Sequence, residues 1–363
     1  MASASTGVLP SQTLRRLFQS GHISGIEDKY INPASIDLPL SDEAYRLESL
    51  FLPLHGEKVR DAIALVGGVS HSLKSPLEVG VPYLVKIAGT YELPTNVYGY
   101  VNPKSSTGRT NLFCRVVADR VDMYDALRPE GFRGEVWVLI RADSFPVLLS
   151  PGQAVSQLRL FDGKTFLDEL ELNLAIKEHG LLFHPEHGKI GEKDVRRHAD
   201  SLLLTLRVVP GETGYECRGV NKILDFSKLK NYEPSDFFSP IEVRGNRTTL
   251  RKGSFYILTT DERIMVPPHL SAELRAIDPR FGEFRSHAAG YIDPGWGYGK
   301  DGSACGRPIT LEVTPHETMM VRHGQTIARI RYESMKGVPE VPYDEASSNY
   351  TVQEGPKLSK HFK

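Results

Sequence analysis

Cysteine is scarce in this sequence of 363 residues. The three cysteines, Cys114, Cys217 and Cys305, are scattered along the chain, and their number is odd. A disulfide framework needs cysteines in pairs at regular spacings, so the pattern excludes that class of small stapled domain. It is typical of a protein that works in a reducing compartment.

A net charge of one sign is also missing. The chain carries 44 Lys and Arg against 45 Asp and Glu, for a formal net charge of −1. Without a basic field over the whole chain, nucleic acid is not expected as a main partner, and an anionic ligand has to be held by a local cluster. No apolar run is long enough to span a bilayer, and the stretch "MASASTGVLPSQ" lacks the core of a signal peptide. We therefore expect no membrane association and a cytoplasmic location.

Helix signals are few and strand signals are many. One amphipathic stretch, "PSQTLRRLFQSGHISG", predicts a short amino-terminal helix with Ser11 as its N-cap and Gly21 as its stop. Elsewhere, runs rich in β-branched and aromatic residues are bounded by turn residues, supplied by 32 Gly and 24 Pro. These runs are "VPYLVKIAGTYEL", "GEVWVLIRA", "QAVSQLRLF", "GSFYILTTDERIMV", "RPITLEV" and "TIARIRYE". The fold class predicted is mainly β, in barrels or jelly rolls.

An internal repeat divides the chain into two related halves. The stretch "LEVGVPYLVKIAGTYELPTNVYGYVNPKSSTGR" aligns with "TLRKGSFYILTTDERIMVPPHLSAELRAIDPR", and "SPGQAVSQLRLF" aligns with "VRHGQTIARIRYE". A repeat of this length signals a duplicated domain rather than a solenoid. With a length that suits two cores, we predict two tandem domains, residues 1–185 and 186–363, joined near residues 175–195.

The first half contains a candidate anion site in "NPKSSTGRTNL". Ser105 and Ser106 offer hydroxyls, Lys104 and Arg109 bring positive charge, and Gly108 lets the backbone come close to a ligand. Arginine binds phosphate oxygens in a fork, so the stretch is typical of a phosphate loop. The alternative is a polar turn with two solvated cations.

The matching stretch of the second half, "LRAIDPRFGEF", is a weaker phosphate site. Arg275 and Arg280 persist, but Ala276 and Ile277 replace the hydroxyls. Asp278 lies beside them, and a carboxylate repels phosphate.

The second half instead carries a candidate acid–base group. "IDPGW" is a turn signal that contains Asp293, and the strand "PITLEV" places Glu312 among apolar residues. A glutamate in an apolar setting has its pKa raised or needs a partner, which suits a general base. The alternative is that strand alternation places Glu312 on the solvent face. The first half has Leu139 at this position, with Asp122 matching Asp293, so the two halves have lost opposite parts of one site.

Together these motifs resemble the dCTP deaminase branch of the dUTPase superfamily. "INPASIDLPL" looks like the entry motif of that family, "SSTGR" like its phosphate loop, and "IDPGW…ITLE" like its nucleoside hairpin with the catalytic glutamate. "VPYDEASSNYTVQEGP" looks like the carboxyl-terminal tail that closes over substrate. The resemblance implies two tandem dUTPase-like distorted β-barrel domains. In the family, active sites lie between neighbouring subunits, which implies a composite site between the two kinds of domain here.

The resemblance also implies roles for particular residues. The catalytic positions fall on Glu312, Ser105 and Arg109. Tyr291 departs from the arginine usual in the family, which the first half keeps as Arg120. The positions that bind substrate fall on Lys104, Ser106, Arg280, Ala289, Tyr291, Asp293, Thr310, Tyr343, Tyr350 and Gln353.

The implied reaction is hydrolysis of dCTP to dUTP and ammonia, a step of pyrimidine deoxyribonucleotide biosynthesis that feeds dUMP and dTTP synthesis. Mg2+ is expected with the substrate triphosphate, because this ion usually binds through phosphates. Zinc is not expected: zinc deaminases need H-x-E with P-C-x-x-C, and the sequence has no C-x-x-C, only His184-Pro185-Glu186-His187 in a turn.

Two alternatives remain open on the sequence. One is a bifunctional enzyme that also hydrolyses dUTP and so gives dUMP, with Asp293 directing water. The other is a nucleotide-binding regulator in which neither half-site works. The resemblance further suggests a homo-oligomer and inhibition by dTTP, and the sequence leaves both open.

Overall fold

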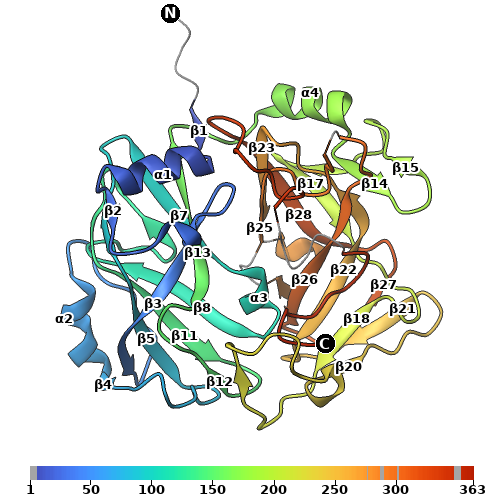
Figure 1. The fold of residues 1–363 in the computed structure, drawn as a ribbon. Coiled ribbons are helices and arrows are strands. Elements are labelled where there is room, and N and C mark those ends of the chain that lie inside the picture. The colour runs from blue at the N-terminus through green and yellow to red at the C-terminus, as the bar shows by residue number, and fades with distance from the viewer. Residues whose placement is uncertain (1–5, 276, 287–289, 301, 347–352) are drawn as a thin grey trace, which may run out of the picture. The chain divides into compact units, whose positions relative to one another are not determined.

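The structure is a computed structural model that describes residues 6–275, 277–286, 290–300, 302–346 and 353–363. It forms two compact units, drawn mainly in blue to green and in green to red in Figure 1. Unit 2 contains Val8–Lys164, Gly219–Glu233 and Ser359–Lys363, and unit 1 contains Thr165–Arg218 and Pro234–Leu358 together with residues up to Gly7. Residues 165–185, which the sequence-based division placed in the first half, therefore pack in unit 1.

Unit 2 is built on one nine-stranded sheet, which curves around its core as Figure 1 shows. The path is β8-β11-β5-β3-β13-β7-β9, with β1 (Gly7–Val8) on β13 and β4 (Val69–Ser70) on β3. Its strands are β3 (Ile36–Arg46), β5 (Pro82–Ile87), β7 (Val97–Pro103), β8 (Leu112–Ala118), β9 (Ala126–Leu127), β11 (Val136–Ala142) and β13 (Ala154–Asp162). Short pairings add β2 (Ile23–Ser24), β6 (Thr90–Glu92), β10 (Arg133–Gly134), β12 (Val147–Leu148) and β19 (Leu224–Asp225).

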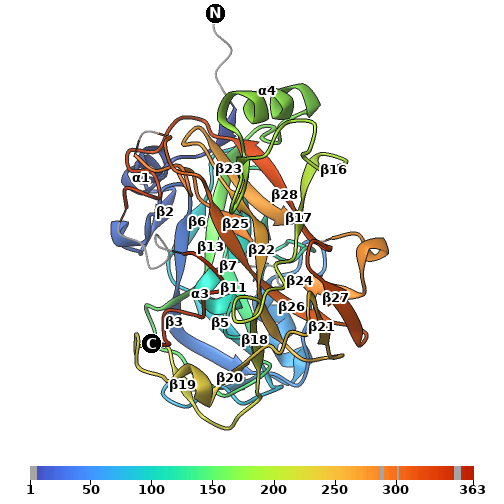
Figure 2. The same ribbon diagram turned by 90° about the vertical axis from the view of Figure 1, so that its right-hand side faces the viewer.

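Unit 1 is also built mainly of strands, which form a seven-stranded sheet, a five-stranded sheet and a two-stranded hairpin. The first sheet contains β14 (Leu182–His184), β15 (Gly188–Lys189), β18 (Gly214–Cys217), β20 (Phe238–Pro240), β22 (Tyr256–Ile264), β24 (Phe284–Ser286) and β26 (Arg307–Pro315). The second contains β16 (Arg197–His198), β17 (Ser201–Thr205), β23 (Leu270–Arg275), β25 (Tyr291–Ile292) and β28 (Thr326–Ser334). Figure 2 shows the hairpin of β21 (Arg247–Leu250) and β27 (Met319–Arg322) at the edge of the unit. Both units are mainly β, which confirms the predicted fold class.

Four α-helices and four 3-10 turns complete the described residues. They are α1 (Ser11–Gln19), α2 (Val59–Ile63), α3 (Ser105–Gly108), α4 (Glu169–His179), η1 (Asp28–Tyr30), η2 (Ala64–Val66), η3 (Pro234–Asp236) and η4 (Pro279–Phe281). The predicted N-cap of α1 is wrong by one residue: Pro10 is the N-cap, and Ser11 is already helical. Ser11 Oγ donates to Gln12 instead of capping the helix, and its N–H donates to the Pro33 carbonyl at 2.9 Å.

Helix α4 was missed in the stretch interpreted as the joint between domains. Asp168 and Glu171 form a capping box, in which each side chain accepts from the other's N–H, and Gly180 ends the helix with a positive φ. This D-x-x-E pattern followed by Gly is a helix signal that the sequence carried. Leu172 and Ile176 bury one face of α4 in the core of unit 1.

The duplication is visible in the register of one strand pair. In unit 2 Leu139 of β11 lies opposite Leu84 of β5, and in unit 1 Glu312 of β26 lies opposite Ile257 of β22. The alignment of the two halves equates the same residues, because Leu139 to Glu312 and Leu84 to Ile257 span the same number of positions. Alternate residues of a strand share one face, so Trp137 and Leu139 in unit 2 correspond to Thr310 and Glu312 in unit 1.

In unit 2 this face is covered by the segment 47–66, which contains α2. Leu47 and Val59 pack with Trp137 and Leu139 in a cluster whose members are almost entirely buried. The Tyr124 hydroxyl donates to the Phe51 carbonyl at 2.8 Å and fixes the segment from the other side. The position that corresponds to Glu312 is therefore filled by apolar side chains of the same unit.

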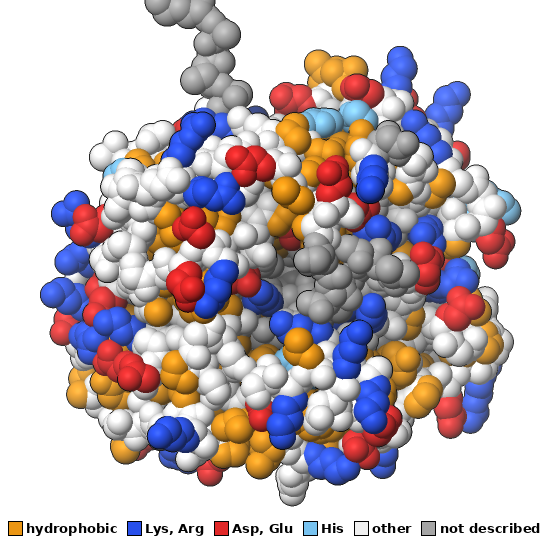
Figure 3. All heavy atoms as spheres, viewed as in Figure 1, with side chains coloured by type: hydrophobic (Ala, Val, Ile, Leu, Met, Phe, Trp, Pro, Cys, Tyr) orange, Lys and Arg blue, Asp and Glu red, His pale blue; other side chains and the backbone are white. Residues whose placement is uncertain are grey.

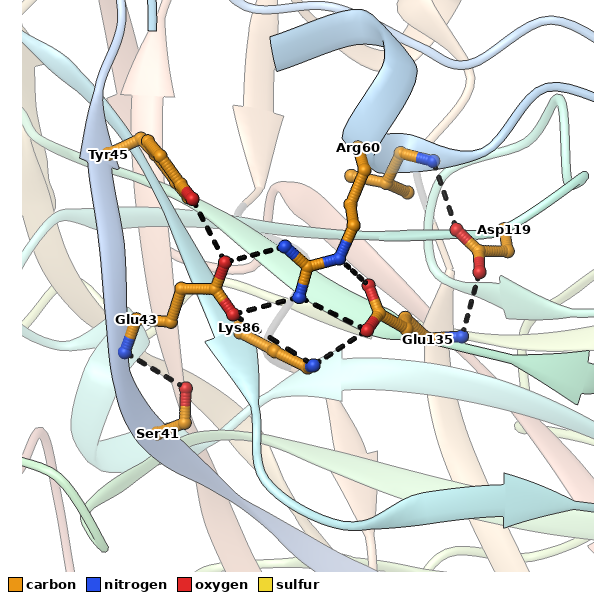
Figure 4. Close-up of polar contacts among 8 residues, drawn as sticks. Ser41, Glu43, Tyr45, Arg60, Lys86, Asp119 and Glu135 are labelled. Carbon is orange, nitrogen blue, oxygen red and sulfur yellow. Dashed lines mark hydrogen bonds and ion pairs between the residues drawn. The ribbon is translucent and has the colours of Figure 1, made fainter. Parts of the chain in front are cut away.

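Arg60 of α2 fastens this cover to the sheet, as Figure 4 shows. Its guanidinium donates to both carboxylate oxygens of Glu43, at 2.7 and 2.9 Å, and to Glu135, at 2.7 and 3.2 Å. Lys86 pairs with Glu135 at 2.6 Å, and Arg60 also lies over the Trp137 ring at 5.0 Å. Burial raises the pKa of Glu135, but the hydrogen bonds and charges of Arg60 and Lys86 have the larger effect, so the pKa is lowered overall. Hydrogen bonds from Arg60 also lower the pKa of Glu43, so both carboxylates stay ionised.

We expect Leu139→Glu to destabilise unit 2 by about 3–5 kcal/mol, because it buries a carboxylate with no partner. The control Leu139→Met should cost under about 1.5 kcal/mol, since it keeps volume and polarity. Urea unfolding is followed by Trp137 fluorescence in a Trp296→Phe background. A tolerated glutamate would show that segment 47–66 does not close this face.

We expect Arg60→Met to lower the free energy of unfolding at pH 7 by about 1.5–3 kcal/mol, the value of hydrogen bonds to charged groups. The folded pKa values of Glu43 and Glu135 are lowered, so their contribution is present above the unfolded pKa and is lost as pH falls through the folded values. The difference between wild type and variant should thus shrink between about pH 5 and pH 3. The control is Arg133→Met. Arg133 pairs with Glu92 at 3.0 Å, but the two side chains are 74% and 45% exposed, so this variant should change stability by less than about 0.5 kcal/mol. Equal effects of the two variants at every pH would contradict the assignment.

Candidate active site

Strand β26 holds the candidate acid–base group in the interior of unit 1. Glu312 is 4% exposed and is flanked by buried Leu311 and Val313. The alternative that strand alternation places Glu312 on the solvent face is therefore wrong. A buried glutamate is costly unless it is paired or hydrogen-bonded, so its retention inside the unit makes Glu312 a candidate functional residue.

The carboxyl-terminal tail lies along the same strand. Gln353, which is 1% exposed, donates from Nε2 to the Pro308 carbonyl at 2.8 Å. The Lys357 N–H donates to Thr310 Oγ1 at 3.2 Å. Pro308, Thr310 and Glu312 alternate along β26 and share a face, so the tail and the glutamate line the same side of the strand. Two predicted substrate-binding residues, Thr310 and Gln353, meet here.

The predicted nucleoside hairpin follows β25, where Tyr291 lies opposite Glu273. Tyr291 is 6% exposed, and two residues on, Asp293 begins a tight turn in which the Trp296 N–H donates to its carbonyl at 3.2 Å. Gly295 is required in this turn, because its φ is +92° and a Cβ there would lie 2.6 Å from Pro342. The backbone of the turn at Gly295 thus packs directly against the Pro342 side chain at the start of the tail.

Arg307 and Asp344 hold the tail against the hairpin, a role that no local sequence pattern indicates. Asp344, with a side chain 3% exposed, forms an ion pair with Arg307 and accepts from the Gly299 N–H at 2.9 Å. Beside it the Tyr343 N–H donates to the Pro294 carbonyl at 2.8 Å, and the Tyr343 ring packs on Trp296 at 5.1 Å. Tyr343, a predicted substrate contact, is thereby fixed to the hairpin.

The predicted phosphate loop in unit 2 is a single helical turn. Lys104 precedes α3, and its carbonyl accepts from the N–H groups of Thr107 and Gly108, each at 2.9 Å. Ser106 and Arg109 are 6% and 4% exposed, while Ser105 is less deeply buried. Four predicted site residues, Lys104, Ser105, Ser106 and Arg109, are therefore brought together on one rigid turn.

The entry motif supports this loop. Asp37 forms an ion pair with Lys104, and Asn32 donates to the other oxygen of Asp37 at 3.0 Å. Two residues before Lys104, Asn102 accepts from Arg159 Nε at 3.0 Å in a buried contact. The residues that resemble the entry motif thus orient the lysine of the phosphate loop.

The corresponding loop of unit 1 is arranged differently. Arg280 lies on η4, with its side chain 82% exposed, and donates to both oxygens of Asp278 at 2.6 and 3.0 Å. These hydrogen bonds from Arg280 hold the pKa of Asp278 well below its usual range. Arg280 is engaged by a carboxylate, and no contact joins it to the residues around Glu312 among those described. Ala276, Ala289 and Tyr350 lie outside the described residues.

Within the ranges that the structure describes, no three His, Cys, Asp or Glu side chains gather in a way that could hold a metal ion. In the same residues, no helix combines the length and apolar character needed to cross a membrane. On the face shown in Figure 3, basic and acidic side chains are interspersed.

Family models match both parts of the chain. The family model of the 2'-deoxycytidine 5'-triphosphate deaminase N-terminal domain matches residues 5–164, and that of the C-terminal domain matches residues 183–362. This chain belongs to the dCTP deaminase family. The resemblance seen in the motifs is confirmed over nearly the whole chain.

Among solved dCTP deaminases, the crystal structure of the enzyme from Agrobacterium tumefaciens is 31% identical and has a TM-score of 0.82. The match covers 92% of this chain and 99% of that one. A "dCTP deaminase, dUMP-forming" of Dictyoglomus turgidum is 34% identical over 35% of this chain, which spans 64% of the relative's length. A "Probable deoxyuridine 5'-triphosphate nucleotidohydrolase" of Methanopyrus kandleri is 32% identical over 36% of this chain and 78% of its own length.

In this dCTP deaminase family member we expect Asp344→Ala to release the hairpin around Trp296. Breaking a buried pair from one side costs about 3–5 kcal/mol, so acrylamide should quench Trp296 more strongly in a Trp137→Phe background. Glu345→Ala removes an exposed neighbouring carboxylate and is the matched control. Equal quenching in both variants would show that Asp344 does not hold the hairpin.

Proposed function

We propose that this chain hydrolyses dCTP to dUTP and ammonia. The observation that carries the proposal is Glu312, a glutamate buried on a strand face whose duplicate in unit 2 bears Leu139 under an apolar cover. Membership of the dCTP deaminase family and the names of its relatives support the same activity. A buried glutamate beside a nucleoside hairpin suits proton transfer at a base.

The two half-sites form one composite site, with unit 1 giving Glu312 and unit 2 giving the phosphate loop. Each half lacks what the other keeps: unit 2 has Leu139 for the glutamate, and unit 1 has Ala276 for Ser105. Within unit 1 the Lys357 N–H donates to Thr310 Oγ1 on the strand that carries Glu312, and within unit 2 Ser359 Oγ donates to the Ser106 carbonyl of the phosphate loop at 2.7 Å.

In this site Glu312 accepts a proton from water, and the resulting hydroxide attacks C4 of cytosine. The proton passes to N3, and a second transfer from the hydroxyl to the exocyclic nitrogen lets the C4–N bond break. Ammonia leaves, the carbonyl of uracil forms, and Glu312 ends unchanged. Ser105 and Arg109 orient the water and stabilise the charge that develops at C4.

Substrate binding is shared among the remaining residues. Tyr291, Asp293, Thr310, Tyr343 and Gln353 contact the nucleoside from the hairpin, strand and tail, with Ala289 and Tyr350 from the same segments. Lys104 and Ser106 hold the triphosphate, and Arg280 takes part only when its pair with Asp278 opens. Mg2+ enters with the substrate, held by phosphate oxygens, and no zinc takes part.

A second candidate is a bifunctional enzyme that gives dUMP. It is favoured by relatives named as dUMP-forming and by the relative named as a probable deoxyuridine triphosphate hydrolase. Asp293 would then direct a second water at phosphorus. The Agrobacterium tumefaciens protein, which matches at full length, is named as a deaminase alone, and on that ground we place deamination to dUTP first.

The test is incubation of purified protein with dCTP and Mg2+, while ammonia is measured and nucleotides are separated. Ammonia with dUTP supports the proposal, and ammonia with dUMP establishes the second candidate. Binding of dCTP without ammonia would leave a regulator in which neither half-site works.

We expect Glu312→Gln to lower kcat by about 10²–10⁴, the usual contribution of general acid–base catalysis. dCTP binding, measured by calorimetry, should change little because glutamine keeps the shape. Glu262→Gln is the matched control: Glu262 lies in the same sheet, with its pKa raised by burial, and its carboxylate accepts from Thr205 Oγ1 at 2.8 Å. Full turnover of Glu312→Gln would overturn the assignment.

A further inference from the structure

The last five residues of the chain are built into unit 2. In the segment Ser359–Lys363, Ser359 is 2% exposed, His361 0% and Phe362 4%. These side chains therefore belong to the interior of unit 2.

A strap formed by residues 219–233 holds this segment by its backbone. The N–H groups of Lys230 and Asn231 donate to the carbonyls of Lys360 and His361 at 3.0 and 2.9 Å. In return the Lys363 N–H donates to the Tyr232 carbonyl at 3.0 Å. The backbone on both sides of Lys360 is thus fixed before any ligand arrives.

His361 anchors the segment from within. Burial lowers its pKa to about 4, so the imidazole is neutral near pH 7. Its ring packs on Phe226 with centroids 4.4 Å apart, and Nδ1 lies 3.0 Å from the Lys228 carbonyl, to which the neutral ring donates.

The segment is attached to the phosphate loop itself. Ser359 Oγ donates to the Ser106 carbonyl at 2.7 Å in a buried contact. This bond satisfies a carbonyl of α3 and fixes the distance between the loop and the next residue, Lys360. The segment Ser359–Lys363 is therefore bonded directly to the phosphate loop.

Lys360 adds a second ammonium group beside Lys104. Its side chain is partly buried, and burial together with the charge of Lys104 lowers its pKa, while Asp37 raises it. Asp37 is already paired with Lys104 and Asn32. Among the described residues, no acceptor lies within hydrogen-bonding distance of Lys360 Nζ. The Asp37 carboxylate is thus paired with Lys104 and acts on Lys360 only through its charge, while Arg109 lies on the same loop as Lys104.

We infer that Lys360 is a further substrate-binding residue, whose ammonium joins Lys104 in holding the polyphosphate of the substrate. The inference rests on the proposed function for the identity of that polyphosphate as the triphosphate of dCTP. A partly buried cation without its own counter-ion is relieved by a bound anion. Because the strap and Ser359 already position the backbone, little ordering entropy opposes binding.

The test uses the full chain and inorganic triphosphate as the probe, titrated by calorimetry. We expect Lys360→Met to weaken triphosphate binding by about ten-fold, or about 1.4 kcal/mol. Lys363→Met removes the same charge from the same segment and should leave binding unchanged, because exposed Lys363 is paired with Glu233 instead. Lys360→Arg should restore part of the affinity.

Kinetics separate binding from folding. With dCTP, Lys360→Met should raise KM and leave kcat near the wild-type value, while its thermal unfolding matches that of Lys363→Met. If Lys360→Met fails to fold, Lys360→Gln is measured in its place. Triphosphate affinity equal to wild type in the folded variant would overturn the inference. Weakened triphosphate binding in a protein that releases no ammonia would retain the inference and reject the proposed function.

Discussion

One strand face, present twice, is the constraint on which the rest of this structure depends. The register of β5 with β11 and of β22 with β26 makes Leu139 and Glu312 equivalent. In unit 2 the face is apolar and segment 47–66 closes it, with Arg60 bridging Glu43 and Glu135. In unit 1 the face carries Thr310 and Glu312, and the tail lies along it. An apolar strand face is stable only when other apolar side chains bury it, whereas a face with a carboxylate needs polar partners. The residues on the face of β11 and of β26 therefore determine which kind of segment packs on each strand.

The carboxyl-terminal tail contacts the candidate residues of each unit separately. Asp344 pairs with Arg307 next to the hairpin, Gln353 and Lys357 bind β26, and Ser359 binds the phosphate loop. Asp344, Gln353 and Ser359 act through their side chains and Lys357 through its backbone N–H.

Much of the fold could be predicted, because its signals are local. The run "GSFYILTTDERIMV" contains β22, "RPITLEV" begins β26 and "TIARIRYE" matches β28, since alternation and flanking turn residues mark strands. Helix α4 is not among the predicted elements, although the capping box of Asp168 and Glu171 is a local signal of its start. The predicted N-cap of α1 is one residue too late, since Pro10 is the N-cap and Ser11 is the first helical residue.

By itself the sequence determined the family, the duplication and the identity of the main candidates, from the phosphate loop to Glu312. These depend on residue types at fixed spacings within short stretches. Only the tertiary structure decided that Glu312 is buried rather than solvent-facing, that segment 47–66 closes the face at Leu139, and that Asp344 and Lys360 belong with the hairpin and the loop. The physical reason is that burial and ion pairing are set by which distant segments pack together. Lys104 and Lys360 are far apart in the sequence, and no local pattern indicates that the charges of Lys104 and Asp37 both act on Lys360.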